Sequence, residues 1–468
     1  MTATAAKPLL NDGGVLRPVL WLALPVLAEE SLNVLVGFTD WFLAGNYLPG
    51  DEPKAAMGLL AYLMWLIPSA FAFVGIGATA LVARFIGAGD RPQAVHAMRQ
   101  SLTLGGLLTG IVMVLCIFGG PTFIRTMQFT GLTAEYAERY LVLLTWAVPF
   151  IMFEQIATAC LRGAGDTVSG LQARVLVNLT NAAVSAALVT GWGPFPHLGW
   201  EGLAVGTLCG HIVGAAMLLV IVLRGRGGIS LSLRLESFDL PMMRRILRIG
   251  LPAGFDLLTV ICCHLVYAGI INSLGTTSQA AHGLGVQIEA MSYLAGSAFQ
   301  VAAATMTGQS LGALNSPRAV RSTLVATALA MTTMCIAGTT FFIFGEQLAE
   351  FFSKTPSATT KLTGDLLKIV AISCPFLAVL QVLSGALRGA GDTAWPFLTT
   401  LAGLLGIRLP GAAWLALEAI PLPLGDYVIP GMGWGVQGAW IAMVADVAVR
   451  SVLISARFAS GRWQHVKV

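Results

Sequence analysis

The sequence predicts an all-α polytopic membrane protein whose twelve transmembrane helices form two parallel-repeat six-helix lobes. Three observations predict it: a very apolar composition, apolar runs as long as a bilayer-spanning helix, and motifs that recur in both halves. Of the 468 residues, 56% are hydrophobic and 11% charged, and the mean hydropathy is +0.78, whereas soluble domains have about 25% charged residues. Only helices and closed barrels satisfy their backbone polar groups in a bilayer, and these runs are too long for barrel strands.

Polar, Gly-rich and Pro-rich stretches divide the chain into apolar segments of about the 20 residues that a spanning helix needs. We expect no removable signal peptide, because no early apolar run precedes a small-residue cleavage site. The first segment should therefore stay as an anchor. The predicted spans are 18–46, 56–83, 94–118, 137–160, 169–192, 201–223, 245–273, 279–308, 319–344, 364–386, 395–419 and 434–456.

The heptapeptide LRGAGDT occurs at 161–167 and again at 387–393, each time after the fourth span of its half. Over the longer stretches 149–167 and 375–393, ten of nineteen aligned positions are identical. "ALPVLAEE" at 23–30 likewise matches "GLPAGFDL" at 250–257. We interpret the heptapeptide as structural: its glycines permit a tight turn, and its Asp and Thr can cap the next helix.

An even number of spans in each half gives both copies the same orientation, which is a parallel repeat. Of the 27 Lys and Arg residues, Arg408 falls inside a span and most of the others on the side of the repeated heptapeptide. The positive-inside rule makes that side cytoplasmic, together with both termini. The predicted organisation is a tail at 1–17, an N-lobe at 18–225, a linker at 226–243, a C-lobe at 244–457 and a tail at 458–468.

The first span carries the most polar groups: Glu29, Glu30, Asn33 and Asp40. At about 100° per residue, Glu29, Asn33 and Asp40 fall on one stripe about 16 Å long. Because ionisable groups inside spans are expensive and mark ion or substrate pathways, we expect this stripe to face a water-filled cavity. Phe38 and Trp41 could line it and hold organic cations by their ring faces, or could equally face lipid or pack.

Fewer polar groups lie in the second half. Asp256 stands at the repeat position of Glu29, and Tyr267 stands at that of Asp40, which makes it a further cavity candidate. Arg408 needs a partner, for which Glu289 and Asp446 are the candidates. We interpret His211 and His282 as helix-packing residues, and the seven cysteines as small buried hydrophobes.

Taken together, these motifs resemble the multidrug and toxic compound extrusion transporters over about residues 18 to 457. The resemblance is carried by "GFTDWFLAG" with Asp40, by "ARFIGAGDRPQA", by both segments that end in LRGAGDT, and by the run 280–313, which contains Glu289. It implies two six-helix lobes around a central cleft that opens alternately to the two sides. It further implies export of organic cations against protons or sodium ions.

For one branch of that family, the resemblance implies an ion site built from an acid in the first helix, an Asn and an Asp in the fifth, and a Thr in the sixth. Here Asp40, Asn181 and Thr207 match, but Ser185 stands at the position of the fifth-helix acid. The predicted ion-coupling and substrate-binding residues are therefore Asp40, Glu29, Glu30, Asn33, Asn181, Thr207, Asp256 and Glu289.

We accordingly predict a cation-coupled antiporter, not an enzyme, that exports organic, cationic and amphipathic compounds by alternating access. The alternatives are a flippase for a lipid-linked substrate and an uncoupled channel. We expect no cofactor or metal beyond the coupling ion, a small-molecule substrate and membrane lipid as partners, no nucleic acid, a monomer, and a multi-pass location in the cell membrane.

Overall fold

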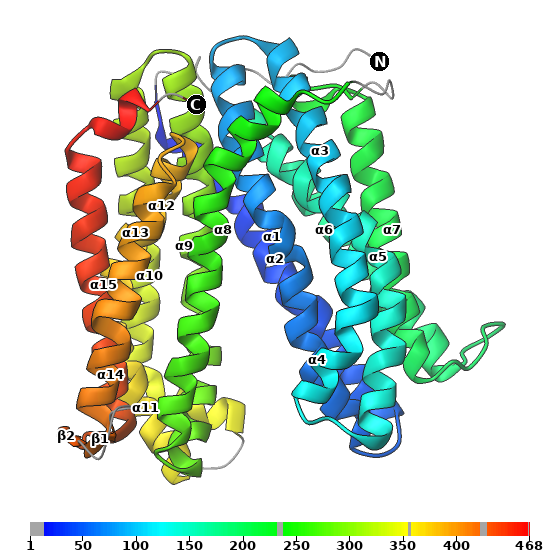
Figure 1. Cartoon of the computed structure of the whole chain (residues 1–468), viewed down its shortest axis with the longest axis vertical. Coiled ribbons are helices and arrows are strands. Elements are labelled where there is room, and N and C mark those ends of the chain that lie inside the picture. The colour runs from blue at the N-terminus through cyan, green and yellow to red at the C-terminus, as the bar shows by residue number, and fades with distance from the viewer. Residues whose placement is uncertain (1–13, 232–236, 354–356, 422–427, 467) are drawn as a thin grey trace. The chain divides into compact units, whose positions relative to one another are not determined.

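The computed structural model describes residues 14–231, 237–353, 357–421, 428–466 and 468, and nearly all of them are helical (Figure 1). The elements of the first half are α1 (Leu16–Tyr47), α2 (Glu52–Gly87), α3 (Arg91–Val114), η1 (Leu115–Gly119), α4 (Gly120–Thr126), α5 (Gly131–Ala164), α6 (Val168–Thr190), α7 (Trp200–Leu223) and η2 (Arg226–Gly228). Those of the second half are α8 (Leu240–Asn272), α9 (Thr276–Gly312), α10 (Ser316–Ser353), α11 (Ala358–Ala371), α12 (Cys374–Gly389), α13 (Ala394–Gly403), η3 (Leu404–Arg408), α14 (Leu409–Ala416), β1 (Ala419–Pro421), β2 (Val428–Pro430), α15 (Gly435–Ala459) and η4 (Arg462–His465). Strands β1 and β2 form an antiparallel pair with Ile420 opposite Ile429.

The predicted helical membrane fold is confirmed, and each predicted span corresponds to helix in the structure. Within the described residues, ten helical segments are long and apolar enough to cross a membrane. The pair α11 and α12, bent by 54°, makes an eleventh if it is one span. The predicted count of twelve additionally needs α9, whose 37 residues are long enough but include many Thr, Ser, Gln and Gly residues that lower its hydropathy.

Two helices contain a π-helical turn just before a proline. η1 precedes Pro121, and η3 precedes Pro410. Proline has no N–H to donate to the carbonyl four residues earlier, so the preceding turn widens to keep its other carbonyls bonded. The turn in η3 carries Arg408, which is 4% exposed.

The described chain divides into two compact units: unit 1 takes residues 21–251 and 312–314, and unit 2 takes residues 14–20, 252–311 and 315–468. The linker at 226–243 stays a prediction, whereas the division by contacts falls inside α8, after Leu251. Glycines explain this, because they let α8 pack closely on α2. A Cβ on Gly77 would lie 2.4 Å from the Ile246 carbonyl oxygen, and one on Gly250 would lie 2.2 Å from that of Phe73.

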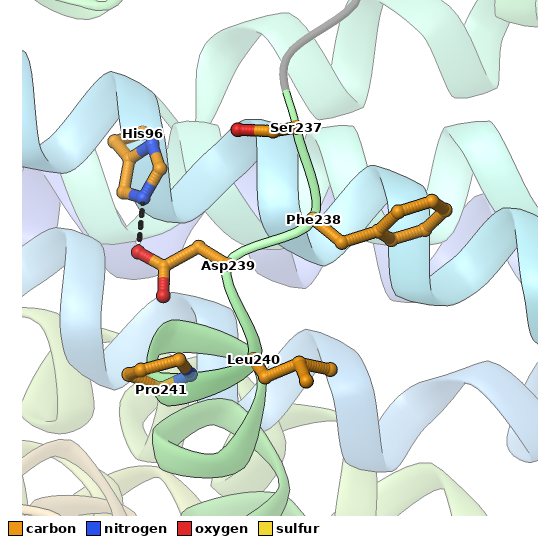
Figure 2. Close-up of a pocket in the computed structure, with 6 residues that line it drawn as sticks. All are labelled: His96, Ser237, Phe238, Asp239, Leu240 and Pro241. Carbon is orange, nitrogen blue, oxygen red and sulfur yellow. Dashed lines mark hydrogen bonds and ion pairs between the residues drawn. The ribbon is translucent and has the colours of Figure 1, made fainter.

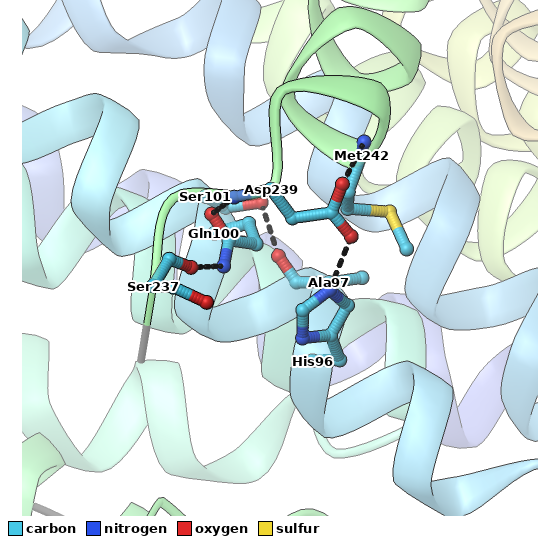
Figure 3. Close-up of polar contacts among 7 residues, drawn as sticks. All are labelled: His96, Ala97, Gln100, Ser101, Ser237, Asp239 and Met242. Atoms are coloured by element: carbon cyan, nitrogen blue, oxygen red, sulfur yellow. Dashed lines mark hydrogen bonds and ion pairs between the residues drawn. The ribbon is translucent and has the colours of Figure 1, made fainter. Parts of the chain in front are cut away.

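Hydrogen bonds that involve side chains of α3 and of the segment before α8 join the two (Figure 3). Gln100 donates from Nε2 to the Ser237 carbonyl at 3.0 Å and accepts from the Asp239 backbone N–H at 3.2 Å. Asp239 caps α8 by accepting from the Met242 N–H at 3.1 Å, and its other oxygen lies 2.8 Å from His96 Nε2. These groups border a cavity of about 420 Å³ lined by His96 and residues 237–241 (Figure 2).

The contact between Asp239 and His96 should be lost only in strong acid. The hydrogen bond with His96, and then that from Met242 N–H, lower the pKa of Asp239 below its ordinary value of 3.8. A lowered pKa in the folded state means that the contribution to stability is present above pH 3.8 and is lost as the pH falls through the folded value. Hydrogen–deuterium exchange of 237–243, corrected for intrinsic pH dependence, should therefore stay slow down to about pH 4 and rise below it.

Asp239→Asn should speed that exchange at neutral pH, whereas Asp51→Asn, which changes a side chain that is 96% exposed, should not. Loss of protection as the pH rises above about 6.5 would contradict the prediction, because it would assign the contact to the charge of His96.

Candidate functional site

Asp40, at the centre of the predicted ion site, is fully buried in unit 1 and surrounded by hydrogen-bond donors. The hydroxyls of Tyr140 on α5 and Thr207 on α7 each donate to Asp40 Oδ2 at 3.3 Å. The amide of Asn181 on α6 lies 3.4 Å from Asp40 Oδ1 and 3.1 Å from Thr207 Oγ1. Asn181 and Thr207 are 1% and 2% exposed, so four helices hold this group away from solvent.

The structure thus brings together Asp40, Asn181 and Thr207, as the family pattern predicted, and adds Tyr140. Tyr140 was not predicted from the sequence, because a neutral hydroxyl within an apolar run is not costly enough to mark a site. One signal was available: a buried Tyr hydroxyl usually needs a polar partner. All three donors are neutral. The Asp40 carboxylate therefore accepts hydrogen bonds from them, but none of the three supplies a positive charge.

Ser185, which stands where the family has an acid, lies where α6 and α7 pack closely. Its Oγ is 3.5 Å from Asn181 Nδ2. A Cβ on Gly206 would lie only 1.9 Å from Ser185 Oγ and 2.9 Å from its backbone nitrogen. A carboxylate is larger than a hydroxyl, so this packing leaves less room for the family acid.

Gly206→Ala should force α6 and α7 apart and disturb the neighbouring Thr207. Overpacking of this kind costs about 1–3 kcal/mol, and we expect a clearly lower unfolding temperature together with reduced transport. The matched control is Gly110→Ala on α3, where an added Cβ meets nothing within 4 Å. Equal thermal stability of the two variants in detergent would contradict the inferred packing.

A cavity of about 390 Å³ lies in unit 1 beside this cluster. Its lining residues are Glu30, Asn33, Gly37, Trp41, Met57, Ala61, Met64, Trp65, Ile67, Pro68, Ser69, Leu144, Ile151, Gln155, Arg174 and His211. The lining is largely apolar and aromatic and includes one acid, Glu30, to which Asn33 donates at 3.1 Å. Such a wall suits an amphipathic organic molecule with one charged or polar end.

The expectation that the stripe of the first helix faces one cavity is only partly met. Glu30, Asn33 and Trp41 line the cavity, but Asp40 and Glu29 are 0% and 4% exposed and have protein partners. The reason is that the other helices of unit 1 supply donors for both acids. Phe38 is 66% exposed and does not line this cavity, so its predicted role with substrate stays a prediction.

The arginine of each LRGAGDT pairs with the acid of the first helix of its own half. Arg162 lies 2.8 Å from Glu29 Oε2 and 3.8 Å from Glu30 Oε1. In unit 2, Arg388 forms the equivalent contact with Asp256. The aspartates of the two copies are also equivalent, because Asp166 pairs with Arg226 and Asp392 with Arg457.

The glycines of the heptapeptide and the aspartate of its first copy agree with the predicted turn, but the predicted threonine cap is wrong. Thr167 and Thr393 stand at the N-caps of α6 and α13 without a side-chain capping hydrogen bond. Gly165 and Gly391 have φ of 93° and 87°, a conformation that favours glycine. Asp166 accepts from the Ser169 N–H at 3.0 Å and so caps the start of α6. Glu29 and Asp256, predicted as coupling acids, therefore each have an arginine counter-ion, and their part in coupling stays a prediction.

In unit 2, Asp446 is the acid that Arg408 contacts, at 2.9 Å, and Arg450 contacts the same oxygen at 2.7 Å. Glu289, the other candidate partner, is 8% exposed on α9. Tyr267 is 2% exposed and packs with the Arg408 guanidinium 6.0 Å from its ring centre. The predicted roles of Glu289 and Tyr267 in binding stay predictions.

Comparison with known proteins agrees with this architecture. A family model described as MatE matches residues 25–186 and 252–414. Among curated relatives, a "Probable multidrug resistance protein NorM" of Thermotoga maritima is 28% identical over 96% of this chain and 93% of its own length. The "Multidrug resistance protein MdtK" of Yersinia pseudotuberculosis is 26% identical over 96% of this chain and 95% of its own length.

Solved structures show the same fold. An outward-facing multidrug resistance MATE family transporter of the MOP superfamily superimposes with a TM-score of 0.86 over 99% of this chain and 100% of its own, at 21% identity. A MOP superfamily transporter from Pyrococcus furiosus gives the same TM-score, coverage and identity. At this identity the similarity concerns the fold.

Proposed function

Because the chain belongs to the MatE family, we propose that it is a proton- or sodium-coupled antiporter that exports organic, cationic and amphipathic compounds. Its curated relatives are multidrug resistance proteins, and it is a multi-pass membrane protein with many apolar spans. The coupling ion, the cationic substrate class, the cytoplasmic position of both termini and a monomeric state are parts of the proposal.

One observation carries the proposal: a buried carboxylate with neutral donors beside an amphipathic cavity. Asp40 accepts hydrogen bonds from Tyr140, Thr207 and Asn181. A buried carboxylate without a cationic partner is costly, and binding a proton or a metal cation removes that cost. Asp40 can therefore alternate between an ionised and a neutralised state.

The cavity would supply the substrate site of this antiporter. Trp41 and Trp65 offer ring faces to an organic cation, and Glu30 offers a negative charge. Neutralising Asp40 in the adjoining cluster lowers the negative charge of unit 1, which weakens cation binding in the cavity. Ion binding and substrate release would then be linked, because each ligand disfavours the other.

Ethidium export from proteoliposomes tests the proposal directly. Vesicles loaded with ethidium and held at an inside-positive membrane potential would be given a proton gradient, a sodium gradient or neither. Ionophore-treated vesicles and protein-free vesicles are the controls. Export that follows one of the two gradients supports antiport. Equal flux with and without gradients would support an uncoupled channel, and movement of a lipid-linked sugar but not ethidium would support a flippase.

A further inference from the structure

We propose that Glu154 and His211 form a second proton-binding site in unit 1, which exchanges protons with the cavity separately from Asp40. Glu154 lies on α5 and is 4% exposed, and its Oε2 is 2.9 Å from His211 Nδ1 on α7. From the sequence alone, His211 was interpreted as a helix-packing residue. Its position in the cavity wall beside a buried acid gives it chemistry that packing does not require.

Of the two carboxylate oxygens of Glu154, only Oε2 has a hydrogen-bond partner among the described residues. The other oxygen, Oε1, is buried and has no partner in the described part of the chain. Gly214 makes the space for that oxygen, because a Cβ there would lie 2.5 Å from Oε1. An ionised carboxylate with one unsatisfied buried oxygen is costly unless its neighbour is cationic. His211 can be that cation when its imidazole is protonated, and it can lose the charge by releasing the proton.

The protonation step is simple. With Nδ1 engaged by Glu154, His211 Nε2 is the nitrogen that can take a proton from the cavity. Uptake of one proton converts a neutral imidazole beside a carboxylate into an imidazolium–carboxylate pair, so the net charge of the pair changes from −1 to 0. The negative state favours an organic cation in the cavity and the neutral state does not.

The position of the pair links it to Asp40 along α7. His211 follows Thr207 by four residues, which is about one turn or 6 Å, and Thr207 donates to Asp40. On α5, Arg162 lies eight residues beyond Glu154, about 12 Å away, and pairs with Glu29. The Glu154–His211 pair therefore lies at a level between the Asp40 cluster and Arg162 along α7 and α5.

Two other charged side chains line the same cavity as His211. The titratable residues that share the cavity wall are Glu30 on α1 and Arg174 on α6. The stretch of α2 that lines the cavity, from Met57 to Ser69, contributes no charged group to that wall. On α3, Gly105 meets this part of α5 through Met152 and Ile156. Proton exchange at His211 is thus influenced by one carboxyl group and one fixed positive charge of the same cavity.

The first test follows the six histidines of the isotope-labelled protein by NMR, with His211→Gln used to assign the signal. The proposal requires the His211 signal to change when the pH is varied from about 5 to about 9, in wild type and in Asp40→Asn alike. A signal that stays constant over that range would overturn the proposal, because it would show that His211 neither takes up nor releases a proton.

The second test counts protons released when ethidium binds to the purified protein in weakly buffered solution. A role of the Glu154–His211 pair in transport rests on the function proposed above. This test therefore examines whether proton exchange at the pair is coupled to substrate binding. We expect Asp40→Asn to retain part of the release, about half if each site gives one proton. Glu154→Gln, His211→Gln and the double variant should each lose the same remaining part, while His465→Gln, outside the spans, should lose none.

The double variant matters because it removes both charges and leaves no unpaired buried acid. Complete loss of proton release in Asp40→Asn, with ethidium still bound, would overturn the second site's role in exchange. Failure of ethidium to bind to wild type would count against the proposed substrate class, and the histidine titration would still decide the proton site.

Discussion

Asp40→Asn should reduce gradient-driven export of ethidium to the level of protein-free vesicles while the protein stays folded. The amide has nearly the size of the carboxylate and can still bond to Tyr140 and Thr207, but it can neither release a proton nor neutralise a cation. A loss of at least about tenfold, equal to about 1.4 kcal/mol in the rate-limiting step, would be needed to assign coupling to this residue.

The measurement is initial efflux rate in proteoliposomes under each gradient, with the amount of reconstituted protein determined in parallel. Asp51→Asn is the control, since that side chain is 96% exposed. Undiminished export by Asp40→Asn would move the coupling site elsewhere, and Glu289 would be the next residue to change. Binding of ethidium that persists while export is lost would assign Asp40 to coupling and not to substrate contact.

Arg162→Ala and Arg388→Ala should each destabilise the folded protein strongly. Each arginine is the partner of an acid whose side chain is 5% or 7% exposed. Removing one partner of a buried ion pair leaves an uncompensated charge, which costs about 3–5 kcal/mol. We expect a marked fall in the temperature at which the protein loses its monodisperse profile in size-exclusion chromatography.

Matched variants separate the charge from the packing. Glu29→Gln combined with Arg162→Ala, and Asp256→Asn combined with Arg388→Ala, should recover most of the loss because no buried charge remains. Arg139→Ala is the surface control: its side chain is 55% exposed, and such pairs contribute about 0–1 kcal/mol. If the single variants were as stable as Arg139→Ala, the two ion pairs would have no role in holding the fold.

The helical fold and its internal repeat could be predicted because they depend on local properties. Apolar run length defines each span, and the repeated LRGAGDT shows that the halves are related. The partners of its arginines could not be predicted, since Glu29 and Arg162 are far apart in sequence and meet only through packing. The assignment of 240–251 to unit 1 could not be predicted either. It depends on Gly77 packing against the α8 backbone and Gly250 packing against the α2 backbone, which the sequence does not show.

The residues of the candidate site could be predicted where burying the polar group costs much free energy, and could not be predicted where that cost is small. Asp40 is conspicuous because a carboxylate inside an apolar run needs a reason. Asn181 and Thr207 were found through the family pattern, and their contacts with Asp40 agree with it. Tyr140 and His211 gave no such signal, because their polar atoms are small parts of side chains that also pack well in apolar surroundings.

The position of the unit boundary within α8 bears on where the chain can be divided. If the chain were cut anywhere in the linker before Asp239, the second piece would still carry 240–251, whose packing partners on α2 belong to the first piece. A cut in the linker would therefore divide unit 1 itself and leave Gly77 of α2 without the α8 backbone against which it packs.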